Sequence, residues 1–304
     1  MKVLVTGGAG FIGSHVVDGC LAEGHSVAVI DDLSTGKRAN VNPQARLHVA
    51  DLCDQAAVER IVEAERPEVI CHLAAKANVR ESMVEPVLYA RVNILGSLSV
   101  LEAARKLGVR KIVYASTGGA VYGEPEYLPV DEQHPIKPVD PYGASKHHVE
   151  HYLYVYGLHF GVDYTILRYP NVYGPRQDPF GEAGVIAIWT ERMLHGKEAV
   201  INGSGDQERD FCYVGDVARG NVLALTRGSR EIYNLGIGVG SSINRVYALL
   251  REFTGYTGPQ VHGPAKQGEV WRIWLKVDKA REGLDWSAQV PLAEGLKRTV
   301  ESFR

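Results

Sequence analysis

The chain has 304 residues, of which 45% are hydrophobic and 23% are charged, and its formal net charge is −3. This length suits one large α/β domain or two closely joined domains with an ample buried core. The slightly negative charge provides no basic field for a phosphate backbone, so nucleic acid is excluded as an expected partner.

The cysteines and the N-terminal residues indicate the cellular compartment in which we expect the protein. Cys20, Cys53, Cys71 and Cys212 are isolated from one another and form no C-x-x-C pair. We see no secretory leader and no long apolar span, and the first predicted strand begins almost at Met1. We therefore expect a reducing, cytoplasmic setting without membrane contact.

A strand, a glycine turn and a helix open the chain. Residues 2–6 are a β-branched apolar run, closely spaced glycines follow, and residues 11–23 have an amphipathic helical pattern. In such a unit Gly7 lets the chain turn sharply, Gly10 lets a phosphate approach the backbone, and Gly13 lets the helix pack on the strand. The helix N-terminus would direct its free N–H groups at a pyrophosphate.

An acidic pair ends the second predicted strand. Residues 26–30 form an apolar run, and Asp31 and Asp32 follow it directly. A carboxylate at this place accepts hydrogen bonds from an adenosine ribose and repels the 2′-phosphate of NADP. The order of turn, helix, strand and acid predicts a dinucleotide site for NAD. The alternative is a glycine-rich turn in some other α/β protein, which the acidic pair disfavours.

Strands and helices alternate through the first half of the chain, which predicts a parallel sheet with right-handed crossovers. The further predicted strands lie at 47–49, 69–72, 111–114 and 164–167. The helices predicted between and after them lie at 55–65, 86–107, 142–160, 183–195 and 216–226.

The regular alternation of predicted strands and helices ends at Arg168. Beyond it the predicted loops are longer, and glycine and proline are frequent. We expect a doubly wound, Rossmann-type α/β domain over residues 1–168 and a smaller α/β portion over 169–304 that binds the substrate. The chain is expected to return to the first domain near residues 211–228. Ligands of such sheets bind at the carboxyl ends of the strands.

A tyrosine and a lysine begin the helix after the proline-rich stretch 125–141. Tyr142 and Lys146 stand at positions i and i+4, so their side chains share one face. A free tyrosine has a pKa near ~10, and an adjacent ammonium and an oxidised nicotinamide favour its phenolate. Tyr142 is then a usable base near neutral pH. The alternative is an ordinary surface pair, because Y-x-x-x-K is frequent by chance.

The turn from Thr6 to Gly13 reads T-G-G-A-G-F-I-G, and together with Tyr142 and Lys146 it resembles the extended short-chain dehydrogenase/reductases. The resemblance covers essentially the whole chain. It implies a Rossmann-type fold, NAD as the cofactor, and a nicotinamide ribose held by Lys146. It also implies a homodimer formed through the helices at 86–107 and 142–160.

The third catalytic group of that family is a hydroxyl just past the strand at 111–114. Residues 115–123 resemble the S-S-S-A-T-V-Y-G segment of sugar-nucleotide 4-epimerases, but a gapless match on V-Y-G puts Gly118 at the catalytic position. We assign the role to Thr117, with the loop shifted by one residue, and assign Ser116 to the cofactor or substrate. The alternative is that Thr117 only ends the strand.

The resemblance also implies a set of cofactor contacts. They lie in the glycine turn, in the loop after the second strand, at later strand ends and in two helices. The residues are Gly7, Gly10, Phe11, Ile12, Gly13, Asp31, Asp32, Ser34, Thr35, Gly36, Asp51, Leu52, Leu73, Ala74, Ala75, Lys76, Asn93, Ser116, Tyr142, Lys146, Tyr169, Asn171 and Val172.

Three segments of the second half resemble substrate-binding motifs of the family. L-R-Y-P-N-V-Y-G-P places Asn171 at a substrate diphosphate, Q-E-R-D-F places Arg209 there, and K-Q-G-E adds Lys266 and Glu269. A guanidinium suits a diphosphate better than an ammonium does, and the family usually has arginine at position 266. Thr117 and the catalytic tyrosine complete the expected substrate contacts.

The resemblance implies NAD-dependent 4-epimerisation of a nucleotide sugar, with UDP-glucose and UDP-galactose as the expected pair. The alternatives are a uronate or N-acetylhexosamine epimerase, a dehydratase, a dehydrogenase, or a silent dinucleotide-binding regulator. Gly118, Gly119 and Ala120 stand where dehydratases carry an acid, which disfavours elimination. By counting from Lys266, Ile273 falls near the family position whose side-chain size admits or excludes an N-acetyl group, and its intermediate bulk leads us to expect a preference for hexoses.

A histidine cluster follows the catalytic pair. His147 and His151 lie one helical turn apart, as metal ligands can, but the H-E-x-x-H order and a third ligand are missing. We therefore predict no metal site.

Overall fold

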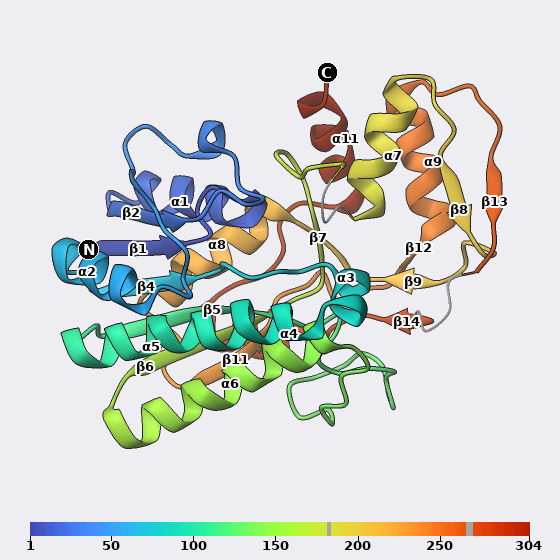
Figure 1. The fold of residues 1–304 in the computed structure, drawn as a ribbon. Coiled ribbons are helices and arrows are strands. Elements are labelled where there is room, and N and C mark those ends of the chain that lie inside the picture. Colours follow the sequence, from blue (N-terminus) through green and yellow to red (C-terminus); the bar gives the residue numbers. More distant parts are fainter. Residues whose placement is uncertain (181–183, 266–269) are drawn as a thin grey trace.

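The computed structural model describes residues 1–180, 184–265 and 270–304. Its centre is a seven-stranded parallel sheet in the order β11-β6-β5-β4-β1-β2-β3, with helices on both faces (Figure 1). The strands are β1 (Lys2–Thr6), β2 (Ser26–Asp31), β3 (Arg46–Val49), β4 (Val69–His72), β5 (Lys111–Thr117), β6 (Asp163–Tyr169) and β11 (Glu231–Asn234). The predicted doubly wound, Rossmann-type α/β fold is confirmed.

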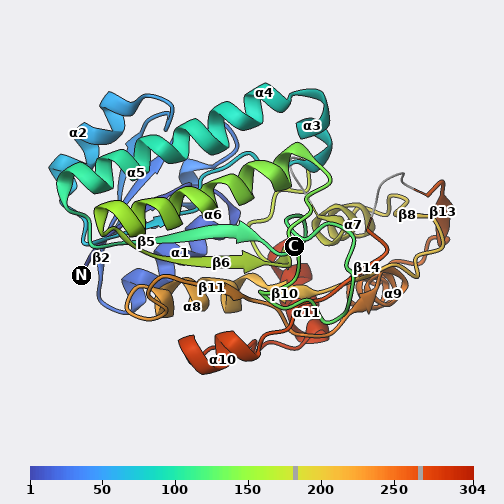
Figure 2. The same cartoon turned by 90° about the horizontal axis from the view of Figure 1, so that it is seen from below.

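Two layers of helices cover the sheet, as the view in Figure 2 shows. One layer packs in the core that contains Val3 and Val5, and it consists of α1 (Phe11–Ala22), α8 (Val214–Ala224) and α10 (Asp278–Leu284). The other packs in the core that contains Leu4, and it consists of α2 (Gln55–Glu65), α5 (Gly96–Leu107) and α6 (Pro141–Phe160). Because both faces are covered, the central strands are mostly apolar, and nearly all their residues are buried.

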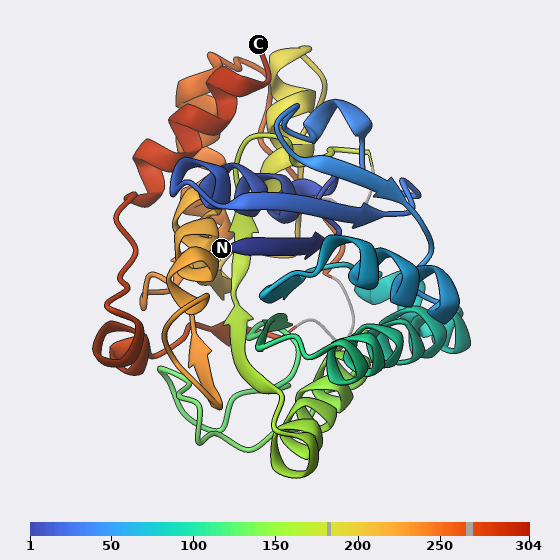
Figure 3. The same ribbon diagram turned by 90° about the vertical axis from the view of Figure 1, so that its left-hand side faces the viewer.

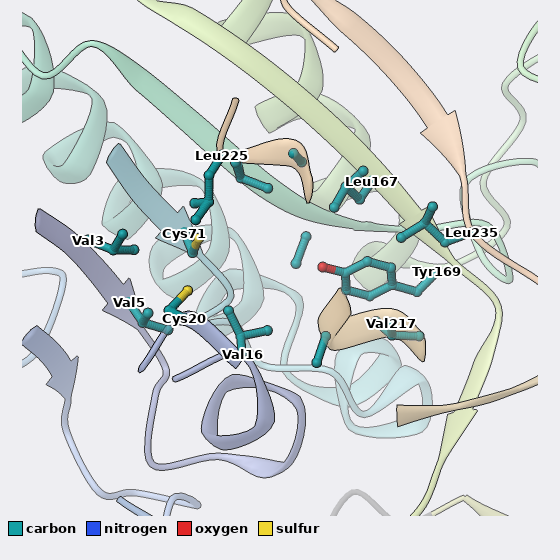
Figure 4. Packing of buried hydrophobic residues seen from close by; sticks show 14 of the residues in the cluster. Val3, Val5, Val16, Cys20, Cys71, Leu167, Tyr169, Val217, Leu225 and Leu235 are labelled. Carbon is teal, nitrogen blue, oxygen red and sulfur yellow. The ribbon is translucent and has the colours of Figure 1, made fainter. Parts of the chain in front are cut away.

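The first of these cores joins the two ends of the chain. Val16 and Cys20 of α1 pack beside Cys71 of β4, and Leu167 and Val217 lie in the same cluster (Figure 4). Residues far apart in the sequence therefore share one hydrophobic interior, which fixes α8 beside α1 on one face of the sheet.

The predicted helix at 86–107 is divided in the structure. It consists of α4 (Pro86–Tyr89), a π-helical turn (Ala90–Leu95) and α5, and the short α3 (Val79–Val84) precedes it. A π turn is wider than an α turn and often occurs at functional sites. It contains the buried Asn93.

The same stretch corrects another expectation. By length and composition, Pro86–Leu107 is apolar enough to cross a membrane, although we expected no long apolar span. Half of it is buried inside the protein, as a core helix would be.

A smaller unit lies beyond the carboxyl ends of the main strands. Its helices α7 (Val185–Leu194), α9 (Ile243–Thr254) and α11 (Leu292–Ser302) share a third core, and Figure 3 shows them together at one end of the molecule. The predicted helix at 183–195 corresponds to α7, and residue 183 itself lies outside the described residues.

Short strands complete this unit. They pair as β7 (Asn171–Tyr173) with β10 (Phe211–Tyr213), β8 (Val200–Asn202) with β13 (Val261–Gly263), and β9 (Glu208–Arg209) with both β12 (Ser241–Ser242) and β14 (Arg272–Ile273). After β10 the chain returns to the main sheet, where α8 packs on α1 and β11 pairs with β6.

Candidate active site

The glycine turn forms a close-fitting cradle between β1 and α1. Gly7 has a φ of +71°, and a Cβ on it would lie 2.8 Å from the backbone nitrogen of Ala74. A Cβ on Gly13 would overlap the carbonyl oxygen of Gly7. Gly10 begins the helix without a side-chain cap, so the first N–H groups of α1 remain open to an anionic ligand. These features fit the pyrophosphate of a dinucleotide.

Asp31 fastens the loop after β2 to this turn. Its carboxylate accepts hydrogen bonds from the backbone nitrogens of Ala9 and Leu33, each at 2.9 Å. Burial raises the pKa of Asp31. A carboxylate has about four acceptor positions, so two remain for a ribose. Asp32 is exposed and accepts from both the backbone and the hydroxyl of Ser34.

The rest of the predicted adenosine contacts lie on neighbouring loops. Ser34 and Thr35 are exposed, and a Cβ on Gly36 would lie 2.7 Å from Asp31 Oδ1, so this position requires glycine. Past β3, Asp51 is exposed and Leu52 is buried. The loops after β2 and β3 lie at adjacent strand ends, where a doubly wound sheet receives its ligand.

Asn93 joins the loop after β4 to the helix that carries the catalytic pair. Lys76 N donates to Asn93 Oδ1 at 2.8 Å, and Asn93 Nδ2 donates to Lys76 O at 3.0 Å and to Ser145 Oγ at 2.9 Å. Both amide hydrogens of Asn93 are therefore used within the protein. The predicted contact of Asn93 with the cofactor would therefore use the second lone pair of Oδ1.

Helix α6 carries Tyr142 in its first turn and Lys146 one turn later. Asp140 caps the helix by accepting from Gly143 N at 2.7 Å. Tyr142 is partly exposed, whereas Lys146 is buried with its Nζ 4.4 Å from the centre of the Tyr114 ring. Burial lowers the pKa of Lys146 to about 7. The ammonium of Lys146 is thus held inside the protein, one helical turn after the partly exposed Tyr142.

The loop after β5 distinguishes Thr117 from Gly118. A Cβ on Gly118 would lie 2.7 Å from Leu275 Cδ1, so a side chain there meets a residue of the smaller unit. Thr117 ends β5, and no group of the described residues hydrogen-bonds its hydroxyl. Thr117 is therefore the residue with a hydroxyl available at this strand end. The hydroxyl of Ser116 donates to Glu150 at 2.5 Å.

A cavity of about 180 Å³ lies in the smaller unit, between β7, α7 and β9. Its polar and aromatic lining residues include Asn171, Gln177, Trp189, Asn202, Gln207 and Arg209. Arg209 is held by hydrogen bonds from Nη1 to Glu208 O and Trp271 O, at 2.9 and 3.2 Å. Lys266 and Glu269, the other predicted substrate residues, lie outside the described residues.

Two glutamines of this cavity were missed by the sequence reasoning. The carbonyl oxygens of Gln177 and Gln207 are buried without a hydrogen-bond partner among the described residues. Gln207 stands two positions before Arg209, so the period of a strand puts both side chains on one side. That spacing was the available signal for Gln207. No comparable signal pointed to Gln177, which reaches the cavity from a loop.

Two further expectations concern Ile273 and the histidines of the catalytic helix. Ile273 does not line the cavity, and its side chain is buried beside Val121 and Leu275. The expected control of N-acetyl tolerance by Ile273 stays a prediction, because that control concerns the hexose rather than this cavity. His147 Nδ1 lies 3.3 Å from Glu150 Oε2, and no group of three possible metal ligands occurs within the described residues.

The remaining predicted cofactor residues lie around this edge of the sheet. Phe11 and Ile12 begin α1, Leu73, Ala74 and Ala75 follow β4, and Tyr169 and Val172 lie on β6 and β7. The Tyr169 hydroxyl donates to Asn221 Oδ1 at 2.8 Å, so its polar end points into the α8 layer.

Known proteins with this sequence pattern share the architecture. The NAD dependent epimerase/dehydratase family matches residues 3–236. A UDP-glucose 4-epimerase of Mycolicibacterium smegmatis is 42% identical, and the match covers 100% of this chain and 99% of the relative. The solved UDP-glucose 4-epimerase of Thermotoga maritima with UDP-glucose is 49% identical, with a TM-score of 0.98 over 100% of this chain and 99% of that one.

A second solved structure, the UDP-glucose 4-epimerase of Thermus thermophilus in complex with NAD, is 47% identical. Its TM-score is 0.95, and the match covers 100% of this chain and 99% of that chain. The glycine cradle, the Tyr142 and Lys146 pair and this similarity along the whole chain agree. The chain belongs to the NAD dependent epimerase/dehydratase family.

Proposed function

We propose that this protein is an NAD-dependent 4-epimerase of nucleotide sugars, which interconverts UDP-glucose and UDP-galactose. The observation that carries the proposal is one edge of the sheet that combines three features. They are the glycine cradle, the Tyr142, Lys146 and Thr117 side chains, and the nearby cavity around Arg209. The names of the full-length relatives support the same activity.

The residues divide the reaction between them. Bound NAD supplies the acceptor for the hydride that leaves C4 of the sugar and later returns to it. Tyr142 takes the proton of the 4-hydroxyl as the hydride leaves, and gives it back when the hydride returns on the other face. Lys146 favours the phenolate of Tyr142, and the Thr117 hydroxyl donates to the reacting oxygen.

The smaller unit holds the rest of the substrate. Arg209 and Asn171 bind the diphosphate, and the cavity beside them takes the nucleoside end. Fixing this end leaves the 4-keto sugar free to turn about the diphosphate, which the change of face requires. Gly118, Gly119 and Ala120 offer no acid for an elimination, so the keto sugar is expected to take its hydride back.

We also infer a cytoplasmic homodimer. Exposed apolar side chains lie on the outer layer of helices, and apolar patches of this kind mark interfaces between subunits. They are Met83, Val84, Val87, Leu95, Tyr154, Leu158 and Phe160. All four cysteines are free thiols, which suits a reducing compartment. Light scattering should give twice the chain mass, and charged residues in place of Val87 and Leu158 should give monomers.

The experiment is an assay without added NAD. Purified protein incubated with UDP-galactose should form UDP-glucose, with no net NADH and no 4-keto-6-deoxy sugar. Release of NADH in proportion to substrate would indicate a dehydrogenase, and a stable keto sugar would indicate a dehydratase. Protein that contains NAD but turns over no nucleotide sugar would support the regulator.

A further inference from the structure

A buried ionic network lies directly behind the catalytic pair. Glu150 follows Lys146 by one helical turn on α6 and is 4% exposed. Its carboxylate accepts from Arg168 Nε at 3.0 Å, from Arg168 Nη2 at 2.6 Å and from Ser116 Oγ at 2.5 Å. Removing one partner of such a buried pair leaves an uncompensated charge, so the pair is strongly constrained.

Arg168 extends the network into the loop after β5. Its Nη1 donates to the Tyr122 hydroxyl at 2.9 Å, and Tyr122 donates to Asn234 Oδ1 at 2.7 Å. Asn234 Nδ2 then donates to Val130 O at 3.0 Å. Arg168 and Tyr122 lie in the motifs that supply Asn171 and Thr117, but the proposed reaction gives neither of them a role of its own. Hydrogen bonds connect both of them to the Glu150 carboxylate, Arg168 directly and Tyr122 through Arg168.

Glu150 therefore connects the two elements that carry the catalytic groups. Tyr142, Lys146 and Glu150 are spaced four residues apart and share one face of α6. The same carboxylate holds Ser116, which immediately precedes Thr117 on β5. One anionic side chain thus fixes the helix of the base and the strand end of the hydroxyl relative to each other.

The groups that face Lys146 come from three elements. His72 lies on β4, Tyr114 on β5, and Tyr142 and Glu150 on α6 itself. Burial lowers the pKa of His72 to about 3, so it is neutral, and burial raises the pKa of Tyr114.

Glu150 behaves differently from these neighbours. Burial would raise the pKa of Glu150, but hydrogen bonds from Arg168 and His147 outweigh it and bring the value to about 2. Among the described groups facing Lys146, Glu150 is therefore the one that is anionic at neutral pH.

We propose that Glu150 is a positioning residue for the reaction: it locks α6 against β5 and supplies the counter-charge that keeps Lys146 protonated. The role of Lys146 toward Tyr142 rests on the proposed function, whereas the counter-charge itself does not. Glu150 touches neither reacting atom. Its effect on the reaction passes through Lys146.

The test measures the protonation state of the Lys146 side chain directly. Protein labelled with ¹³C at the lysine ε-carbons is titrated by NMR, and the Lys146 signal is identified by its loss in Lys146→Arg. The wild-type midpoint is expected near 7. Glu150→Gln should lower it by about one pH unit, because the charge of Glu150 raises the pKa of Lys146 and nearby opposite charges typically shift a pKa by about 1–3 units.

Two further variants separate charge from structure. Glu150→Asp keeps the charge and should move the midpoint much less than Glu150→Gln does. Ser116→Ala removes a hydrogen bond to the same carboxylate without changing any charge, and should leave the midpoint in place. An unchanged midpoint in folded Glu150→Gln, or an equal shift in Ser116→Ala, would overturn the proposal.

Folding of the single variant is a separate risk, because it leaves Arg168 as an unpaired buried cation. The double variant Glu150→Gln with Arg168→Gln removes both charges and should still lower the midpoint, and an unchanged value there would also overturn the proposal. In assays, the alkaline limb of the epimerase rate should move with the Lys146 midpoint. A wild-type protein without epimerase activity would defeat the proposed function and leave the titration valid.

Discussion

The cofactor half of this protein, built on the main sheet, and the substrate half, formed by the smaller unit, differ in how their buried polar groups are hydrogen-bonded. Around the main sheet, Asp31, Asn93 and Glu150 each bond to several protein groups. In the cavity of the smaller unit, Gln177 and Gln207 keep buried carbonyl oxygens that no described residue satisfies. Buried polar atoms without a partner are rare in folded proteins and call for an explanation.

The difference separates a preformed site from one that its ligand completes. A cofactor that is regenerated in each turnover binds more tightly to a rigid site whose polar groups are already hydrogen-bonded, because little conformational entropy is lost on binding. A nucleotide sugar must enter and leave, and its own polar groups can satisfy what the cavity leaves open. Variants of the cofactor half should therefore change the chemical step, and variants of the cavity should change substrate affinity.

The largest effect is expected at the base. Tyr142→Phe removes the phenol oxygen but retains the ring, so the fold and bound NAD should persist. General-base catalysis contributes about 10²–10⁴ in rate, and kcat should fall by that factor. Turnover of UDP-galactose by the variant within a few-fold of wild type would exclude Tyr142 as the base.

The next effect tests which residue supplies the hydroxyl. Thr117→Ala removes a donor to the reacting oxygen and should lower kcat by about 10², whereas Thr117→Ser should retain most activity. The measurement is steady-state kinetics with both variants. Equal activity of the alanine and serine variants would show that the Thr117 hydroxyl takes no part.

A third variant tests the cavity. Arg209→Leu removes a cation from the expected diphosphate site, and hydrogen bonds to charged groups contribute about 1.5–3 kcal/mol. KM for UDP-galactose should rise by about 10–100-fold with a much smaller change in kcat. Arg245→Leu, on the exposed face of α9, is the matched control and should leave both constants unchanged. A fall in kcat alone would place Arg209 in the chemical step and remove the contrast between the halves.

The smallest effect concerns the junction of the halves. Asp210 accepts from the backbone nitrogens of Ile237 at 2.9 Å and of Gly238 and Leu275 at 3.2 Å. Burial raises its pKa from 3.8 to about 6. The folded protein therefore binds this proton more readily than the unfolded chain, so the contribution of Asp210 to stability is lost as the pH rises through 6.

Chemical denaturation at pH 5, 6 and 7 measures this contribution. On going from pH 7 to pH 5, wild type should gain about 1 kcal/mol of unfolding free energy relative to Asp210→Asn. Parallel pH profiles for the two proteins would contradict the raised pKa.

The first half of the fold could be predicted because its elements are long and have clear ends. The helix expected at 55–65 and the strand expected at 69–72 match α2 and β4 residue for residue. The π-helical turn at 90–95 could not be predicted, since the apolar pattern that predicts a helix does not distinguish a π turn from an α turn. Strands such as β9 and β14 have two residues each, too few for any periodicity.

The site was predictable where one motif holds the whole function, and unpredictable where contacts come from distant segments. Tyr142 and Lys146 share a helix, so their spacing alone places them together. Leu275 leaves no room for a side chain at position 118, and Ile273 is buried. Both features depend on how the smaller unit packs against the loop after β5. Counting along the chain gives no information about that packing.

In the proposed reaction, the hydride removed from C4 returns to the same sugar. UDP-galactose carrying deuterium at C4 is mixed with an equal amount of non-deuterated UDP-galactose that carries ¹³C throughout the hexose, and the UDP-glucose formed is analysed by mass spectrometry. Deuterium should stay in the ¹²C product alone, at C4, with no solvent hydrogen incorporated there. Deuterium in the ¹³C product, or its loss to solvent, would contradict a hydride that is held and returned within one catalytic cycle.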